Sequence, residues 1–143
     1  MSKFAQGKFT PKNPGKYIGK GLPTYRSSWE NMFMVFLDNN PSIQQWAGES
    51  IKIPYRNPVT GKQSIYVPDF FIVYIDANNQ THGEIIEIKP SHESTMEAAR
   101  SLRDKMVVAI NLAKWQAARA WCSAHNLAFR IVTEKDLFHQ GSR

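Results

Sequence analysis

Apolar residues recur every three or four positions in two stretches of the chain, and this spacing predicts two amphipathic helices. The first helix is expected to begin after Ser27, because Ser27 and Glu30 have the spacing of a capping box, and to stop at residues 38–41. The second is expected over about residues 102–124. Its predicted buried face consists of Leu102, Met106, Ile110, Ala113, Ala117, Ala120 and Trp121.

Runs of β-branched and aromatic residues predict the strands. Residues 64–75 and 82–89 form two such runs, joined by a polar turn, and 51–55 and 127–133 add two shorter ones. Residues 43–46 are expected to be a connection. Both faces of 64–75 are apolar, as in a central strand covered on both sides. The order αβββαβ predicts an α/β fold in which a mixed sheet is flanked by helices.

The first 24 residues have no periodicity and are interrupted by Gly and Pro. We therefore expect an extended arm over 1–24 and one folded domain over 25–143, with the domain able to fold without the arm. The chain has a net charge of +6, and the whole excess precedes Glu30, where no acid occurs. The six cations there are Lys3, Lys8, Lys12, Lys16, Lys20 and Arg26. A basic arm on a neutral domain indicates a polyanionic partner or, alternatively, a solvated tail.

Composition excludes several classes of protein. The 143 residues, 42% of them hydrophobic, suffice for one domain with a core of its own. No apolar run approaches the roughly 20 residues of a membrane span, and the N-terminus lacks the apolar segment of a signal peptide. The single Cys122 excludes an internal disulfide and a zinc site built from several cysteines. These features fit a cytosolic protein without membrane contact.

The candidate chemistry lies on the two longest predicted strands. Side chains alternate along a strand, so Glu87 and Lys89 share a face, and a hairpin register can place Asp69 beside Glu87. Two carboxylates suit a hard divalent cation, and a neighbouring lysine can position or deprotonate a water molecule. The simpler alternative is a solvated edge strand with an ion pair. We favour the metal site because an aspartate in an apolar strand is costly unless it is paired or metal-bound.

These residues resemble a known family. Pro68-Asp69 followed by Glu87-Ile88-Lys89 is similar to the signature of the PD-(D/E)xK nucleases. A narrower resemblance is to the TnsA-like branch, and within it to the head completion nucleases of large contractile-tailed phages. It rests on residues 7–17, 25–30, 53–55, 68–70, 87–89 and 131–134.

The resemblance implies a restriction-endonuclease-like fold and a catalytic set of Glu30, Asp69, Glu87 and Lys89. It implies Mg²⁺ as cofactor, with Mn²⁺ as a substitute, held by Asp69, Glu87, the backbone carbonyl of Ile88 and, in addition, Glu30. The implied reaction is hydrolysis of phosphodiester bonds in double-stranded DNA during late head assembly. The implied partners are head and neck proteins at the portal vertex, which places the protein in the virion and the host cytoplasm.

Other residues have a weaker claim. His92, Lys114 and Gln116 are candidate accessory residues that touch substrate or orient water, although a surface histidine is the simpler account of His92. Asn111 is expected on the helix surface. The six arm cations are expected to bind DNA. The rival account is that the arm docks on a capsid protein through Phe4, Phe9 and Tyr17.

Two alternative functions remain open at this stage. One is a structural plug or adaptor at the phage neck, which keeps a nuclease fold and works by binding. The other is a transposase-like endonuclease subunit, which would need a separate recombinase as partner.

Overall fold

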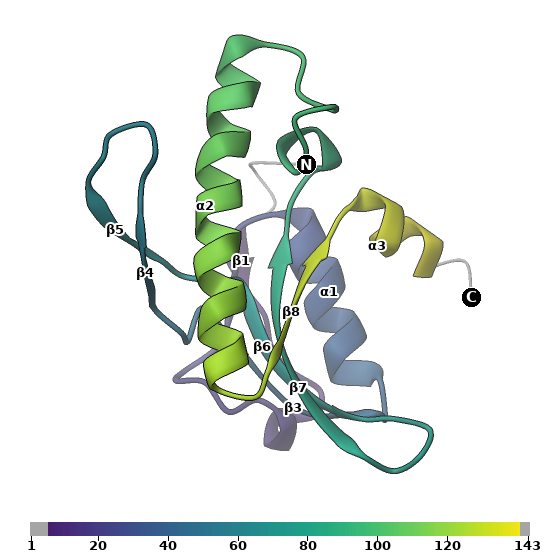
Figure 1. Ribbon diagram of the computed structural model, residues 1–143. Helices are drawn as coiled ribbons and strands as arrows, with labels where there is room; N and C mark the ends of the chain where they lie inside the picture. The colour runs from purple at the N-terminus through teal and green to yellow at the C-terminus, as the bar shows by residue number, and fades with distance from the viewer. Residues whose placement is uncertain (1–5, 141–143) are drawn as a thin grey trace.

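A mixed four-stranded sheet lies between helices in the computed structural model, which describes residues 6–140, with side chains to 137 (Figure 1). Strands β3 (Ile43–Gly48), β6 (Phe70–Ile75) and β7 (Thr81–Ile88) are antiparallel neighbours. Strand β8 (Ala128–Val132) pairs in parallel with β7 and completes the order β3-β6-β7-β8. The predicted mixed α/β sheet is confirmed.

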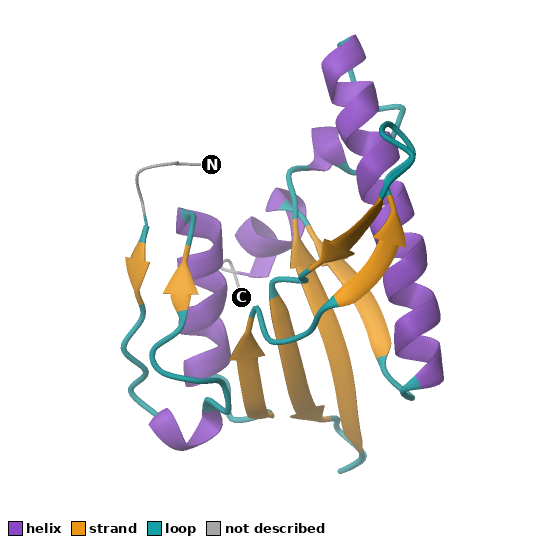
Figure 2. Ribbon diagram, turned by 90° about the vertical axis from the view of Figure 1, so that its left-hand side faces the viewer, coloured by secondary structure: helices purple, strands orange, loops and turns teal. Residues whose placement is uncertain are grey.

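Two helices cover opposite faces of this sheet. Helix α1 (Ser28–Asn39) and the N-terminal segment lie on one face, and α2 (Leu102–Ala124) lies on the other (Figure 2). Helix α2 connects β7 to β8, as a parallel pair requires. A short helix, α3 (Glu134–Gln140), follows β8 and contacts α1. None of the helices in the described residues is long and apolar enough to cross a membrane.

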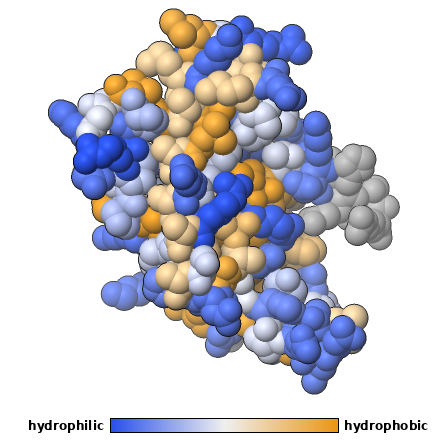
Figure 3. Space-filling model, in the orientation of Figure 1, coloured by the Kyte–Doolittle hydropathy of each residue, from blue (hydrophilic) through white to orange (hydrophobic). Residues whose placement is uncertain are grey.

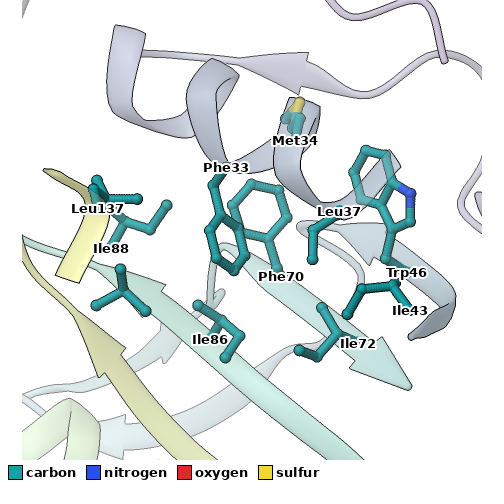
Figure 4. Packing of buried hydrophobic residues seen from close by; sticks show 11 residues of the cluster. Phe33, Met34, Leu37, Ile43, Trp46, Phe70, Ile72, Ile86, Ile88 and Leu137 are labelled. Carbon is teal, nitrogen blue, oxygen red and sulfur yellow. The ribbon is translucent and has the colours of Figure 1, made fainter. Parts of the chain in front are cut away.

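The larger core fills the space between α1 and the sheet (Figure 4). It forms because α1 presents apolar residues at helical spacing while the strands present alternate residues to the same side. In Figure 4, Phe33 of α1 points toward Phe70 of β6 and lies close to Ile86 of β7. The buried members are Phe33, Met34, Leu37, Ile43, Trp46, Phe70, Ile72, Ile86, Ile88, Val132 and Leu137.

A second core joins α2 to a hairpin that stands outside the main sheet. Strands β4 (Ile53–Arg56) and β5 (Gln63–Tyr66) pair with each other and project beside α2 (Figure 1). The turn between them uses Gly61, whose φ of 73° lies in the left-handed region that favours glycine. The buried residues of this core are Ile53, Tyr55, Tyr66, Trp115 and Ala118.

Two predictions about strands were wrong. Residues 64–75 are divided between β5 and β6 at Pro68, which has no N–H to donate to a ladder, and Ile65 on β5 is 58% exposed. The predicted connection at 43–46 is instead part of β3, the first strand of the main sheet. A register shift between Ile43 and Gln45 breaks the alternation of side chains, which is why the sequence pattern did not indicate a strand.

The buried face of α2 also differs from the predicted one. Its buried residues are Val108, Asn111, Trp115, Ala118 and Cys122, whereas the predicted Leu102 and Met106 are 76% and 43% exposed. The reason is that the first turns of α2 extend beyond the main sheet (Figure 1). Apolar side chains therefore reach the surface on that half of α2 and on the hairpin (Figure 3).

The N-terminal segment packs against the domain rather than extending from it. Strand β1 (Gly7–Lys8) pairs with β2 (Thr24–Tyr25), and a 3-10 turn, η1 (Pro14–Lys16), lies between them. Aromatic rings of the segment meet the buried Trp46: the ring centroid of Tyr17 is 4.7 Å from that of Trp46.

The same segment forms hydrogen bonds with polar groups at the C-terminal end of α1. The carboxylate of Asp38, 1% exposed, accepts the backbone N–H groups of Lys12 at 2.8 Å and Asn13 at 3.0 Å. The ammonium of Lys16 donates to the backbone carbonyl of Asn40 at 2.7 Å and also reaches those of Leu37 and Asp38. A cation at the negative end of the helix dipole stabilises α1. Residues 6–24 of the arm are therefore part of the folded structure.

Candidate active site

Two chain segments bring acidic residues together at one end of the sheet. Strand β6 starts where the antiparallel β7 ends, since Phe70 pairs with Ile86. Asp69 immediately precedes Phe70, and its Oδ2 accepts the backbone N–H of Ile88 at 2.7 Å. The structure thus places Asp69 next to the Glu87–Lys89 segment, as the hairpin register predicted.

Glu87 and Lys89 lie on the α2 side of the sheet, because Ile86 and Ile88 point into the core under α1. Glu87 is only 5% exposed. Its Oε1 accepts the hydroxyl of Tyr66 at 2.8 Å, and its Oε2 lies 3.7 Å from the ammonium of Lys89. Both oxygens of this buried carboxylate therefore have a partner.

The electrostatics of the pair favour a cation. Burial raises the pKa of Asp69 well above its usual range, and the negative charges of Glu87 and Glu30 raise it further. Burial also raises the pKa of Glu87, although Lys89 and the Tyr66 hydroxyl oppose this. A divalent cation between two such carboxylates would offset both their burial and their mutual repulsion.

The donor set fits Mg²⁺ better than an ion that needs an all-protein cage. Among the residues whose side chains are described, no three His, Cys, Asp or Glu converge as a ready-made ligand set. Mg²⁺ commonly keeps several waters and binds through one or two carboxylates together with substrate phosphate. Asp69 and Glu87 match this requirement, with water, backbone carbonyl and phosphate as the remaining ligands.

Glu30 serves the start of α1 and also faces the acids. The hydroxyl of Ser27 accepts the N–H of Glu30 at 3.2 Å, as the predicted capping box requires. The Glu30 carboxylate reaches back to the N–H of Arg26, at 3.1 Å, instead of that of Ser27. Burial raises the pKa of Glu30, and its charge acts on Asp69. The structural and the catalytic interpretations of Glu30 are compatible.

Of the three accessory candidates, Lys114 is the one that approaches the acids. Its ammonium lies 5.9 Å from the ring centroid of Tyr55 and 5.7 Å from that of Tyr66. Burial and the charge of Lys89 lower the pKa of Lys114, while the charges of Glu87 and Asp69 oppose this.

The other helix candidates have different surroundings. Gln116 is exposed and lies about 200° around the helix from Lys114, which places it away from the acids, and its accessory role stays a prediction. His92 is exposed and pairs with its neighbour Glu93, at 3.5 Å, in the turn η2 (Ser91–Glu93). Asn111, predicted on the surface, is buried and donates to the carbonyl of Glu93 at 3.0 Å.

We expect Gln116→Ala to cleave DNA at the wild-type rate, because its side chain points away from the acids. Lys114→Ala, made in parallel, removes a cation next to them and should lower the cleavage rate on plasmid DNA. A large loss of activity in Gln116→Ala would contradict this placement.

Sequence reasoning missed Glu49, which links Arg26 to Asp69. The backbone N–H of Glu49 donates to the carbonyl of Asp69 at 3.0 Å. Its carboxylate accepts two hydrogen bonds from the Arg26 guanidinium, at 3.0 Å and 3.2 Å. Its φ of 49° is uncommon for a residue other than glycine. Nothing in the local pattern after β3 distinguishes this glutamate from a surface residue.

A cavity of about 510 Å³ lies beside this link. The arm forms one wall and the residues after β3 form the other. Its lining residues are Tyr17, Ile18, Gly19, Lys20, Gly48, Glu49, Ser50 and Lys52. Its charged lining residues are the exposed Lys20 and Lys52 together with Glu49.

The six arm cations have unequal surroundings. Lys3 lies outside the described residues. Lys8, Lys12 and Lys20 are exposed, and the Lys8 ammonium donates to the Thr24 hydroxyl at 2.8 Å. The other two have partners in the protein. Arg26 pairs with the carboxylate of Glu49, and the Lys16 ammonium donates to backbone carbonyls at the end of α1. The ammonium of Lys16 already has hydrogen-bond partners, and its contact with DNA stays a prediction.

Comparison with known proteins identifies the family. A family model described as TnsA-like endonuclease N terminal matches residues 40–134, which contain Asp69, Glu87 and Lys89. The head completion nuclease of Enterobacteria phage T4 is 34% identical over 141 residues, covering 92% of each chain. The chain belongs to the TnsA-like endonucleases. This membership confirms the predicted family and makes the protein a nuclease, a hydrolase that acts on DNA. Glu30 and the arm precede the residues matched by the TnsA-like model.

Proposed function

We propose that this protein is a Mg²⁺-dependent endonuclease that hydrolyses phosphodiester bonds of double-stranded DNA during late phage head assembly. The observation that carries the proposal is the pair formed by the half-buried Asp69, just before β6, and the buried Glu87, near the end of β7, with Lys89 beside the second carboxylate. Such a pair is stable at neutral pH only with a compensating cation or proton.

In this proposal Asp69, Glu87 and the carbonyl of Ile88 hold Mg²⁺, and Glu30 orients a water in contact with it. The ion, when bound, lowers the pKa of water and neutralises charge that develops on the phosphate. Lys89 keeps Glu87 ionised and donates to the attacking water or to a phosphoryl oxygen. Lys114 adds a second positive charge on the α2 side. Mn²⁺ replaces Mg²⁺ with the same ligands.

The biological setting follows from the T4 relative, whose name is head completion nuclease. We propose the same setting for this chain: residues 25–143 act as the nuclease domain and residues 1–24 as the arm, in contact with head and neck proteins at the portal vertex. The protein then occurs in the host cytoplasm during assembly and in the virion afterwards.

A plasmid cleavage assay tests the enzymatic part of the proposal. Supercoiled DNA should be nicked or linearised with Mg²⁺ or Mn²⁺ and remain intact with EDTA. If the wild-type protein binds to heads and completes them without cleaving any DNA in either metal, the adaptor function replaces the nuclease function. If cleavage appears only when a recombinase is added, the transposase-like alternative is favoured.

We propose that DNA reaches the acids along the cavity between the arm and the end of β3. Lys20 and Lys52 line this cavity, and Glu49 connects its wall to the backbone of Asp69. Phosphates lying there would pair with both lysines. The exposed Lys8 and Lys12 extend the basic surface along the arm.

The double substitution Lys20→Ala and Lys52→Ala is expected to weaken DNA binding and to reduce its salt dependence. Each phosphate contact contributes about 0.9 to the slope of log K against log salt, so the slope should fall by about 2. Titrations of a labelled duplex at several salt concentrations measure this. The matched control is Lys105→Ala with Lys135→Ala, which removes two exposed lysines from α2 and α3. Equal slopes for the two pairs would rule out the cavity as the DNA path.

A further inference from the structure

A tyrosine outside the main sheet holds the buried carboxylate of Glu87. Tyr66 ends strand β5 of the projecting hairpin and is 3% exposed. Its hydroxyl donates to Oε1 of Glu87 at 2.8 Å, across 21 positions of sequence. Strands β4 and β5 form a two-stranded sheet of their own, separate from the main sheet. The contact between Tyr66 and Glu87 therefore links two parts of the fold.

The two partners of Glu87 fix the plane of its carboxylate. The hydroxyl of Tyr66 binds one oxygen, and the ammonium of Lys89 lies 3.7 Å from the other. A carboxylate held at one oxygen only can rotate about its last side-chain bond. Of the two contacts, the 2.8 Å hydrogen bond is the shorter and the more directional.

The hydroxyl of Tyr66 has a single proton to donate, and the 2.8 Å hydrogen bond directs that proton to Oε1 of Glu87. Groups that orient metal ligands in this way commonly contribute 10- to 100-fold to metal affinity or activity.

We infer that Tyr66 is a positioning residue whose hydroxyl holds the Glu87 carboxylate in the orientation that binds the metal ion. The inference rests on the proposed function, because it concerns the same ion. It makes the hairpin part of the nuclease site, although the hairpin carries no group that touches the ion.

The neighbouring Tyr55 provides a matched control. It lies on β4 of the same hairpin, is 8% exposed, and its ring lies under the ammonium of Lys114, as the ring of Tyr66 does. The hydrogen bond to Glu87 is donated by Tyr66. Tyr55→Phe and Tyr66→Phe therefore remove the same atom from the same hairpin, and only the second removes a partner of Glu87.

The test measures Mn²⁺ binding directly, by the loss of the free-ion electron paramagnetic resonance signal, on full-length protein. The variant Asp69→Asn lacks a proposed ligand, so the Mn²⁺ binding that it loses relative to wild type is the binding at this site. Tyr66→Phe is expected to bind Mn²⁺ roughly 10- to 100-fold more weakly than wild type and to regain cleavage at high Mn²⁺. Tyr55→Phe should bind as wild type does. Wild-type affinity in Tyr66→Phe would overturn the inference.

A measurement on the wild-type protein applies even if Tyr66→Phe fails to fold. With ¹³C at the tyrosine ring carbon that bears the hydroxyl, the Tyr66 resonance should shift when Mg²⁺ is added, and that of the distant Tyr74 should not. An unchanged Tyr66 resonance in Mg²⁺-saturated protein would contradict the positioning role.

These outcomes separate the two proposals. If wild type cleaves DNA and Tyr66→Phe binds Mn²⁺ normally, the nuclease function stands and the positioning role falls. If wild type binds Mn²⁺ but never cleaves, while Tyr66→Phe loses Mn²⁺, the positioning role stands and the nuclease function falls.

Discussion

Asp69→Asn is expected to abolish DNA cleavage and, at the same time, to stabilise the metal-free protein at neutral pH. Asparagine keeps an oxygen that can accept the N–H of Ile88, so the local hydrogen bond survives. It removes the negative charge that Glu87 and Glu30 oppose. The substitution therefore removes a ligand of the metal ion. It also removes the repulsion between carboxylates that destabilises the metal-free fold. Glu87→Ala should also abolish cleavage, since it removes the other carboxylate.

The sign of the stability effect follows from the pKa of Asp69. This pKa is raised in the folded state above its value of about 3.9 in the unfolded chain, so the folded state binds the proton more tightly. The contribution of Asp69 to the stability of the metal-free wild type is therefore greatest below about pH 4. This contribution is lost as the pH rises through the pKa of Asp69 in the folded state. Asp69→Asn lacks this loss and should be more stable than the wild type at neutral pH without metal.

Urea unfolding in EDTA at several pH values measures the stability, and plasmid nicking in Mg²⁺ measures the activity. Asp76→Asn is the control, because Asp76 lies at the far end of β6 and interacts with His82, which lowers its pKa. It should retain cleavage and gain no stability. Cleavage at the wild-type rate by Asp69→Asn would disprove the assignment of the metal site.

Deleting residues 1–24 is expected to destabilise the domain strongly, contrary to the prediction from sequence that the domain folds without its arm. The deletion removes the N–H groups of Lys12 and Asn13 from the buried Asp38 carboxylate and the Lys16 ammonium from the end of α1. It also uncovers Trp46. Hydrogen bonds to charged groups contribute about 1.5–3 kcal/mol each, so losing several of them is a large part of the 5–15 kcal/mol stability of an ordinary domain.

Urea unfolding of the full-length and truncated proteins checks this expectation. A triple substitution of the exposed Lys8, Lys12 and Lys20 by alanine is the control, because it removes charge and keeps the backbone contacts to Asp38. The control should unfold near the wild-type midpoint and show weaker DNA binding. Equal stability of the truncated and full-length proteins would mean that the contacts to Asp38 contribute nothing.

The parts of the structure that depend on local chemistry were predictable from sequence. The Ser27 cap, the two helices, and the neighbouring strands with Asp69 and Glu87 at their adjoining ends all follow from patterns along continuous stretches of the chain. The membership in the TnsA-like family, suggested by the same residues, is confirmed.

The parts that depend on tertiary arrangement were not predictable. The bulge in β3 and the break at Pro68 each interrupt an alternation that the sequence pattern assumes. The choice between Lys114 and Gln116 depends on which face of α2 meets the hairpin. The contact of Tyr66 with Glu87 depends on where the hairpin folds, and no pattern near either residue encodes it.

The arm has a further consequence for how the chain avoids other copies of itself. Strand β3 is an outer strand of the sheet, and such strands offer free N–H and C=O groups to strands of other molecules. Here Ile18 donates its N–H to the carbonyl of Trp46 at 2.9 Å, and Tyr17 forms a parallel bridge to the same residue. Ribosomes synthesise the arm before β3, so the segment that protects this edge against intermolecular pairing is already present when the edge forms.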